Sequence, residues 1–170
     1  RIGEGPDLDC VVPLAQRVAA EFSQVKPIVV DALPVHATGG SDAQELGYSL
    51  ATGVAYLRVL TEAGLDIDTA AKLLEFRYAA TTEQFPTIAK LRAARRVWSR
   101  VLEVSGAAAD IGQYQHVVAS PTMLTRRDPY GNLLRETVAG FAAGVAGADA
   151  VTLLPFDAAI CAPTPFSRRI

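Results

Sequence analysis

The sequence predicts an α/β fold of about four parallel β/α units, because short apolar runs alternate with segments of helical periodicity. Three runs have clear boundaries, at residues 28–31, 116–120 and 150–155. Each is largely apolar at successive positions, as in strands that are buried on both faces of a parallel sheet. Such strands need a long crossover between them, which the helical segments supply.

The composition favours one domain with a hydrophobic core. Half of the 170 residues are hydrophobic, which excludes a disordered tail. The 16 basic and 18 acidic residues leave a net charge of -2, so we expect no nucleic-acid partner. No apolar run reaches the roughly 20 residues that span a bilayer, and residues 1–6 contain no apolar core of a signal peptide. We therefore expect a cytoplasmic protein with no membrane partner.

The two cysteines, Cys10 and Cys161, lie near opposite ends of the sequence, without the Cys-x-x-Cys spacing of a zinc site. We interpret both as small, buried apolar residues rather than as members of a disulfide framework. The sequence predicts no metal-binding residues.

The expected secondary structure follows from apolar periodicity and from turn and capping residues. Ser41 and Gln44 have the spacing of a capping box, so a long helix should start there, after a turn-rich stretch at residues 33–40. Asp128 and Pro129 are likewise typical of a helix start. In chain order, the predicted elements are helix 11–22, strand 27–31, helix 41–64, helix 66–74, strand 74–78, helix 82–103, strand 115–120, helix 128–147 and strand 150–154.

Two of these helices carry patterns that bear on function. The helix at 82–103 has five basic residues, which we interpret as a solvated face rather than as a phosphate or nucleic-acid site. The helix at 128–147 has an apolar stripe that we expect to be its buried face, and Gly144 and Gly147 should end this helix. The basic residues are Lys90, Arg92, Arg95, Arg96 and Arg100, and the stripe consists of Leu134, Val138, Phe141 and Val145.

Four β/α units amount to half of an eight-stranded (β/α)8 TIM barrel, or to most of a small doubly wound sheet. The doubly wound alternative lacks its nucleotide-binding motif, because no strand is followed by Gly-x-Gly-x-x-Gly and no Walker A lysine is present. We therefore predict a partial TIM barrel, and we expect this chain to be an internal segment of a longer protein.

Four segments together resemble one family, the coenzyme-B12-dependent methylmalonyl-CoA mutases. They are residues 88–98 (IAKLRAARRVW), 128–135 (DPYGNLLR), 146–159 and 166–170, of which the first two are the more specific. The resemblance extends in the same order from Ile28 to Ile170. It implies that residues 1–170 belong to a single acyl-CoA-binding TIM-barrel domain, and that the cobalamin-binding domain is a separate one outside this chain.

The resemblance also implies that active-site positions have changed. Catalytic members place a Tyr-His pair directly after the first of these strands, where this chain has Leu33 and Pro34. Neither side chain offers a hydrogen-bond donor, an acceptor or a titrating group. An Arg and a Ser near the CoA tail correspond to Leu73 and Glu75, which reverses the local charge. The other implied positions are His116, which keeps the family's His, and Val118 and Asp149, which each replace a Gln.

These replacements favour the small, non-catalytic subunit of the heterodimeric mutase, with a role in assembly and stability. The implied partners are the large catalytic subunit, where methylmalonyl-CoA and succinyl-CoA would be interconverted by radical rearrangement, and the remainder of this chain's own barrel. Adenosylcobalamin would serve the assembled enzyme, with none bound by this segment. The alternative is a catalytic barrel segment of an active acyl-CoA mutase or of another TIM-barrel enzyme.

We expect no catalytic residue here, and at most a vestigial pocket formed by His116, Ser120, Leu33 and Pro34. A lone His in an apolar run, such as His116, is more often a hydrogen-bonded barrel-lining residue than a ligand. Ser120 lies at a strand-to-loop junction, but no His or Asp at a suggestive spacing activates it, and we interpret it as a turn residue. His36 is expected to be a solvated loop residue, because the Asp-x-His-x-x-Gly setting of a cobalt ligand is absent.

Overall fold

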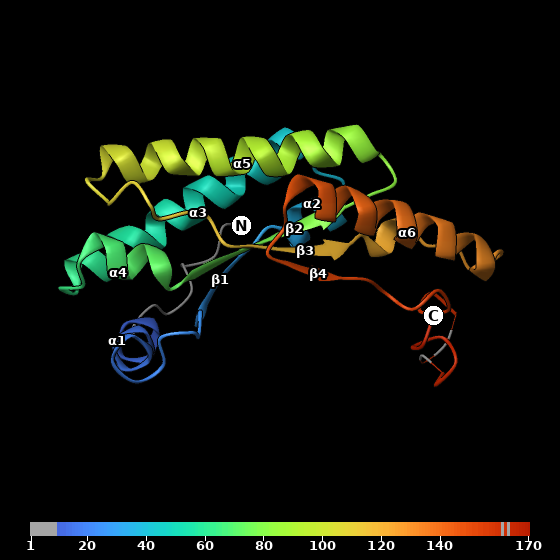
Figure 1. Cartoon of the computed structure of the whole chain (residues 1–170), viewed down its shortest axis with the longest axis horizontal. Helices are drawn as coiled ribbons and strands as arrows, with labels where there is room; N and C mark the ends of the chain where they lie inside the picture. Colours follow the sequence, from blue (N-terminus) through green and yellow to red (C-terminus); the bar gives the residue numbers. More distant parts are fainter. Residues whose placement is uncertain (1–9, 161, 163) are drawn as a thin grey trace.

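A computed structural model of the chain describes residues 10–160, 162 and 164–170. At its centre is a sheet of four strands that pair with each other in chain order and are all parallel (Figure 1). The strands are β1 (Ile28–Asp31), β2 (Leu74–Ala80), β3 (Gln115–Ala119) and β4 (Ala150–Thr152). This arrangement confirms the predicted α/β class and is consistent with a segment of a (β/α)8 barrel.

Helices connect the strands, and the three longest lie on the same side of the sheet (Figure 1). None of the helices in the described ranges is long and apolar enough to cross a membrane. The elements are α1 (Val11–Glu21), α2 (Leu33–Ala37), α3 (Asp42–Glu62), α4 (Ile67–Lys72), α5 (Gln84–Val104), the 3-10 turn η2 (Pro121–Met123) and α6 (Pro129–Ala146).

Capping residues set several helix ends, as the sequence indicates. The Ser41 side chain accepts a hydrogen bond from the backbone N–H of Gln44, whose side chain accepts one from the Ser41 N–H, so the capping box is complete. Asp128 caps the first turn of α6. At the other end of α6, Gly147 has a φ of 81°, in the left-handed region that glycine tolerates best. The expectation that Gly144 also ends this helix is wrong, because it lies inside the last turn.

The turn-rich stretch after β1 contains a helix, α2, which the sequence analysis does not predict. Pro34 lies in the first turn of α2, where a proline is tolerated because the N–H it lacks would have no partner within the helix. The N–H of Leu33 donates to Asp31 Oδ1 at 3.0 Å, which satisfies a second N–H of that turn. The proline therefore starts a helix here rather than a loop.

Cys10 precedes α1, at the edge of the fold, and is exposed. The expectation that it is buried is wrong, because α1 is far less enclosed than the helices that cover the sheet. Cys161, for which the same expectation was made, lies outside the described residues.

The core lies between the sheet and helices α3 and α5. Phe76 of β2 and Trp98 of α5 are each 1% exposed and meet edge-to-face, with ring centroids 4.6 Å apart. Gly53 of α3 lies against both rings, since a Cβ at this position would come within 2.8 Å of Trp98 and 3.0 Å of Phe76. The absence of a side chain at Gly53 therefore sets how closely α3 packs on the core.

A buried ion pair joins α3, α5 and the sheet. The side chains of Glu45 and Lys90 are almost completely buried, and Lys90 Nζ lies 2.6 Å from Glu45 Oε2. Lys90 Nζ also lies 2.9 Å from Asp42 Oδ1. The second Glu45 oxygen accepts a hydrogen bond from the N–H of Ala79 at 2.8 Å. Both carboxylate oxygens thus have partners, which offsets the cost of burying the charge.

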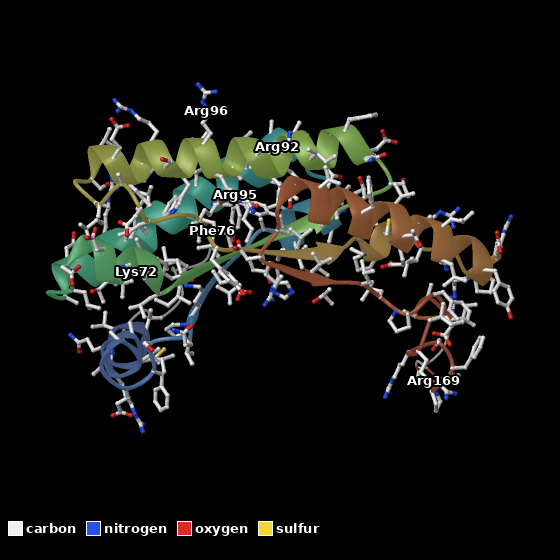
Figure 2. The ribbon with its side chains drawn as sticks, in the orientation of Figure 1. Lys72, Phe76, Arg92, Arg95, Arg96 and Arg169 are labelled. Atoms are coloured by element: carbon white, nitrogen blue, oxygen red, sulfur yellow. The ribbon has the colours of Figure 1, made fainter. Side chains whose placement is uncertain are left out.

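The prediction that the basic residues of α5 form a solvated face is wrong for Lys90 and Arg95, whereas Arg92, Arg96 and Arg100 are exposed. Lys90 belongs to the buried ion pair. Arg95 donates to the carbonyl of Ala146 at 2.7 Å, and Arg92 donates to a neighbouring carbonyl at 3.3 Å. These carbonyls end α6 and lack partners within their own helix, so two arginines of α5 cap α6. Arg96, by contrast, points away from the fold (Figure 2).

The apolar stripe of α6 faces away from the sheet, contrary to prediction. Leu134 is 72% exposed, Phe141 60% and Val145 44%, whereas Val138 is half-buried. The helix packs on the fold through small and polar side chains instead, because short side chains let it lie close to the strands. Its buried residues are Asn132, Glu136, Ala139, Ala142, Ala143 and Ala146.

A chain of buried polar side chains crosses the core. The hydroxyl groups of Ser49 and Tyr78 lie 2.9 Å apart, and Gln113 Nε2 donates to the Tyr78 hydroxyl at 3.1 Å. Gln115 Nε2 then donates to Gln113 Oε1 at 2.7 Å and to the carbonyl of Leu91 at 2.9 Å. Burial raises the pKa of Tyr78 to about 12, so its hydroxyl remains protonated at neutral pH.

Candidate functional site

A row of polar side chains lies on the face of the sheet opposite to the long helices. Successive side chains of a strand point to opposite faces, and Phe76 of β2 packs against α5. Its neighbours Glu75 and Arg77 therefore point to the other face. The strand register aligns Arg77 with Asp31 of β1 and with His116 of β3. In a closed barrel this face lines the interior.

Ion pairs and hydrogen bonds connect this row. Arg77 Nη1 lies 3.4 Å from Asp31 Oδ2, and Arg77 Nη2 lies 3.5 Å from Glu75 Oε1. The same Glu75 oxygen lies 2.9 Å from His116 Nδ1. His116 Nε2 lies 2.8 Å from Thr152 Oγ1. We call this set, which spans all four strands, the inner-face network: Asp31, Glu75, Arg77, His116 and Thr152.

Both ring nitrogens of His116 are occupied. An ionised carboxylate can only accept, so Nδ1 donates to Glu75, and in the neutral ring Nε2 accepts from the Thr152 hydroxyl. The His116 side chain is 21% exposed. The structure thus places His116 as a hydrogen-bonded residue lining this face, with no ring nitrogen left for a substrate or a metal ion.

The inner-face network is held together by charge. The Arg77 guanidinium lies between two carboxylates, and its Nε is buried without a hydrogen-bond partner. An acyl chain running along this face would have to displace these ion pairs, which are partly exposed: the Arg77 side chain is 30% exposed and the Asp31 side chain 38%. The sequence contained a signal for this charged face, because Leu74 to Tyr78 alternates apolar and charged residues, as a strand with two different faces does.

At the carboxyl ends of the strands, His36 of α2 meets Ser120, the residue after β3. His36 Nε2 lies 2.6 Å from Ser120 Oγ, which also lies 2.8 Å from Thr122 Oγ1. The interpretation of His36 as a solvated loop residue, and of Ser120 as lacking a nearby His, is therefore wrong. The two residues are 84 positions apart in sequence, and the unpredicted helix α2 brings them together. Ser120 also acts as the predicted turn residue, since its side chain caps η2.

The His36–Ser120 distance suits a nucleophile and its base, but the burial of Ser120 does not. Ser120 is 0% exposed, so its hydroxyl has no access to a substrate. We interpret the contact as one that fastens α2 to the end of β3.

Leu33 and Pro34 lie in the first turn of α2, at the same edge of the sheet as Ser120. Leu33 is half-buried and Pro34 is exposed. His116 lies four residues before Ser120 on β3 and belongs to the inner-face network instead. The four residues of the predicted vestigial pocket therefore fall into two groups, one at the mouth and one within the sheet.

Two other positions implied by the family resemblance have structural roles. Leu73 is 5% exposed and forms part of the hydrophobic core. Asp149 Oδ2 accepts a hydrogen bond from the N–H of Gln115 at 2.7 Å and lies 3.9 Å from Arg95 Nη2. Asp149 thus ties the start of β4 to β3 and α5.

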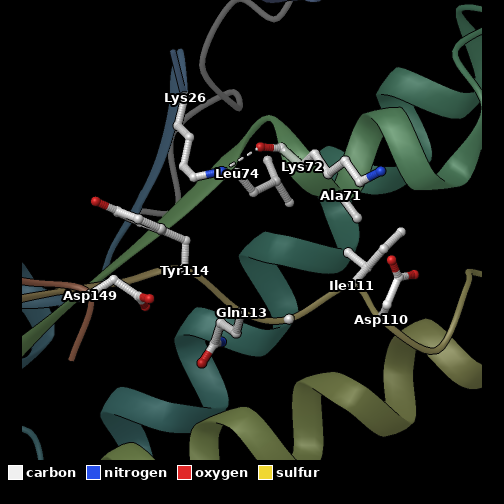
Figure 3. A pocket seen from close by; sticks show the side chains of 10 residues that line it. Lys26, Ala71, Lys72, Leu74, Asp110, Ile111, Gln113, Tyr114 and Asp149 are labelled. Carbon is white, nitrogen blue, oxygen red and sulfur yellow. Dashed lines mark hydrogen bonds between the residues drawn. The ribbon is translucent and has the colours of Figure 1, made fainter. Parts of the chain in front are cut away.

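A hollow of about 240 Å³ lies at the amino-terminal ends of the strands (Figure 3). Lys26 Nζ donates to the carbonyl of Lys72 at 2.9 Å and lies 4.9 Å from the centre of the Tyr114 ring. Active sites of barrel enzymes lie at the opposite end of the strands, so this hollow is not the candidate site. Its lining residues are Lys26, Ala71, Lys72, Leu74, Asp110, Ile111, Gly112, Gln113, Tyr114 and Asp149.

Glu136 is a buried acid on the sheet-facing side of α6. One of its oxygens accepts a hydrogen bond from the N–H of Leu154 at 2.9 Å, and the other is buried without a hydrogen-bond partner. Burial raises the pKa of this carboxyl group, and the hydrogen bond from Leu154 opposes the rise only in part.

Glu136→Gln should therefore change stability in a pH-dependent way. A raised pKa means that the folded state binds the proton more tightly than the unfolded state. The parent therefore loses stability as the pH rises above 4.5, the usual pKa of a glutamate side chain. Glutamine does not titrate. The midpoint of urea unfolding is measured for the full-length variant and for the parent at about pH 4 and about pH 7. The midpoint of the variant minus that of the parent should be larger at about pH 7. A difference that is the same at both pH values would contradict the burial of a charged Glu136.

Comparisons with known proteins agree with this fold and with the resemblance of the sequence. The family model for methylmalonyl-CoA mutase matches residues 3–170. The chain belongs to the methylmalonyl-CoA mutase family. Within the family, a methylmalonyl-CoA mutase small subunit from Streptomyces virginiae is 58% identical over 160 residues, which cover 94% of this chain and 26% of that protein.

Two further relatives show the range of the family. The small subunit from Propionibacterium freudenreichii subsp. shermanii is 40% identical over 162 residues, 95% of this chain and 25% of that protein. A methylmalonyl-CoA mutase from Escherichia coli (strain K12) is 29% identical over 167 residues, 97% of this chain and 23% of that protein. The chain thus spans about a quarter of the length of the curated mutases it matches.

Proposed function

We propose that this chain is a segment of the TIM-barrel domain of a methylmalonyl-CoA mutase small subunit, where it serves assembly and stability rather than catalysis. The observation that carries the proposal is the inner-face network, in which the side chains of Asp31, Glu75, Arg77 and His116 contact each other. An acyl-CoA chain along this face would have to displace the ion pairs of Arg77 with Asp31 and Glu75. The identities of 58% and 40% to proteins named as small subunits support the same assignment.

The mouth of the barrel segment supports a non-catalytic role. Leu33 and Pro34 occupy the positions that the family resemblance assigns to a catalytic Tyr-His pair. Neither can donate a hydrogen bond to a thioester carbonyl from its side chain, and neither titrates. The one His-Ser contact at the mouth, between His36 and Ser120, is too enclosed to serve as a replacement.

The proposed partners are the large catalytic subunit and the remainder of the chain's own barrel. In the assembled enzyme, which we place in the cytoplasm, adenosylcobalamin would support the radical interconversion of methylmalonyl-CoA and succinyl-CoA in the large subunit. All 170 residues would belong to one barrel domain, with the cobalamin-binding domain elsewhere in the protein.

The residues of this segment do not fit a cobalamin site. Both ring nitrogens of His116 are hydrogen-bonded, and His36 Nε2 is held by the buried Ser120. In the part of the chain that the structure describes, no group of three His, Cys, Asp or Glu side chains could hold a metal ion. We therefore propose that this segment binds neither cobalamin nor a metal.

The His116→Ala variant of the full-length heterodimer tests the proposal. Interconversion of methylmalonyl-CoA and succinyl-CoA should remain within about three-fold of the parent, because His116 would only hold the inner-face network and would not touch substrate. Turnover should be measured on the fraction that elutes as the intact heterodimer, so that a loss through faulty assembly is not scored as a loss of catalysis.

The alternative, a catalytic barrel in an active acyl-CoA mutase, is favoured by one observation: His116 keeps the histidine that the family resemblance implies at this position. The same assay decides between the two. A fall in turnover of about 10²-fold or more in the intact heterodimer, the scale on which a general acid or base acts, would show that this barrel is catalytic.

A further inference from the structure

An uncharged apolar stripe runs along the outside of α6. Its members follow each other at intervals of four or seven residues, which places them on one face of the helix. That face is opposite to the buried Ala139 and Ala143. The only charged residues of α6, Arg135 and Glu136, do not belong to it. We call it the outer stripe of α6: Tyr130 (65% exposed), Leu134 (72%), Phe141 (60%) and Val145 (44%).

Apart from Phe156, which stacks on Tyr130, the described neighbours of α6 leave the outer stripe uncovered. Helix α5 packs beside α6 and caps its end, and the Leu153 side chain lies against Gly140, on another face. The exposed surface of α5 is different, because it carries the charged residues Arg96, Arg100 and Glu103. An apolar face without charge, on a helix that is otherwise well packed, is typical of a surface that another segment covers.

The size of the outer stripe fits a single segment rather than a second subunit. A helix of 18 residues is about 27 Å long, and a face about 10 Å wide gives roughly 270 Å². A stable interface between two proteins buries about 800 Å² on each partner. One helix or one extended segment, by contrast, covers such a face completely.

The last residues of the chain lie close to one end of the stripe. The ring of Phe166 is 6.2 Å from that of Phe156, which stacks on Tyr130 at 5.4 Å. The chain therefore reaches Ile170 near the first turn of α6 (Figure 1). About three quarters of the length of each related mutase lies outside the region matched here, so a long stretch of polypeptide is available to cover the stripe.

We infer that the outer stripe of α6 is covered by the continuation of this same polypeptide beyond Ile170, which lies lengthwise on the helix with apolar residues facing it. The inference is independent of whether the barrel is catalytic, since it concerns only the outside of α6. Val97 and Val104 of α5, which are also exposed, stand among charged residues and lie outside the predicted contact.

Thiol labelling in the full-length small subunit tests the inference. Leu134→Cys and Phe141→Cys are made singly, in a background whose other cysteines are replaced by serine, with Arg96→Cys as the exposed control. A maleimide should label the two stripe cysteines about tenfold or more slowly than the control in the native protein, and at the control's rate in urea. Protection should be the same at high and low protein concentration and with or without the large subunit.

Any other labelling pattern would overturn the inference. Labelling at the control's rate would mean that nothing covers the stripe. Protection that appears only with the large subunit would assign the surface to the heterodimer, and protection that disappears on dilution would assign it to a second copy. A photo-crosslinking phenylalanine analogue at position 141 gives a second measurement that preserves the aromatic ring. Its cross-link should map to a peptide of the same chain beyond Ile170, and a cross-link to the large subunit would refute the assignment.

Discussion

Lys90→Met should lower the free energy of unfolding of the full-length protein by about 3–5 kcal/mol, the cost of leaving a buried charge without its partner. Glu45 is 0% exposed, and its only charged partner in the buried contact is Lys90. The hydrogen bond from the Ala79 N–H cannot compensate a full negative charge. The methionine side chain fills a similar volume, so the loss should come from electrostatics and not from a cavity. Urea unfolding of parent and variant measures it.

Two further variants separate the ion pair from other effects. Arg96→Met makes the same kind of change on the exposed side of α5 and should alter stability by about 0.5 kcal/mol or less. The double variant Glu45→Gln/Lys90→Met removes both charges and keeps an acceptor for the Ala79 N–H, so it should recover more than half of the loss. A double variant no more stable than Lys90→Met would show that the buried charge is not the cause.

Gly53→Ala should destabilise the full-length protein by about 1–3 kcal/mol, although alanine is the better helix former. The added Cβ would lie 2.8 Å from the Trp98 ring and 3.0 Å from the Phe76 ring. Both rings are buried in contact with each other, so neither can move away without disturbing the core. The midpoint of urea unfolding gives the measurement.

Gly47→Ala in the same helix is the matched control. A Cβ at Gly47 would have no atom within 4 Å, and the residue is exposed. Alanine there should stabilise α3 by about 0.5–1 kcal/mol, because glycine loses more backbone entropy in a helix. The two substitutions should change the free energy of unfolding in opposite directions. Stabilisation at both positions would mean that α3 does not pack closely on Phe76 and Trp98.

The elements that the sequence predicts well are those with local causes. Ser41 with Gln44, and Asp128, mark helix starts through side-chain hydrogen bonds within one turn. The positions of the strands follow from apolar runs of a few residues, although β4 is largely exposed and not buried as predicted. The parallel order follows from the helical crossovers between the strands. Each of these features depends on neighbours in the sequence, which is why one sequence suffices to find them.

The features missed have causes that a single sequence does not contain. The His36–Ser120 contact joins residues 84 positions apart, through the short helix α2. A proline within this helix and two glycines after it make the segment resemble a turn in the sequence. Lys90 looks solvated on its own helix, and only the packing of α3 brings Glu45 to it. The stripe of Leu134 and Phe141 has the correct helical period for a buried face, but periodicity does not say which neighbour covers it.

The buried polar chain from Ser49 to Gln115 has a consequence for how the strands find their alignment. Val117, Val118 and Ala119 of β3 are apolar at successive positions, so hydrophobicity alone distinguishes the possible registers of this part of the strand poorly. A slip of β3 by one residue would turn Gln115 to the opposite face and break its hydrogen bonds to Gln113 Oε1 and to the carbonyl of Leu91. Each buried group left unsatisfied costs about 1–3 kcal/mol, so misaligned β2–β3 pairings should be short-lived during folding. Hydrogen bonds that add little to net stability can in this way select the correct pairing.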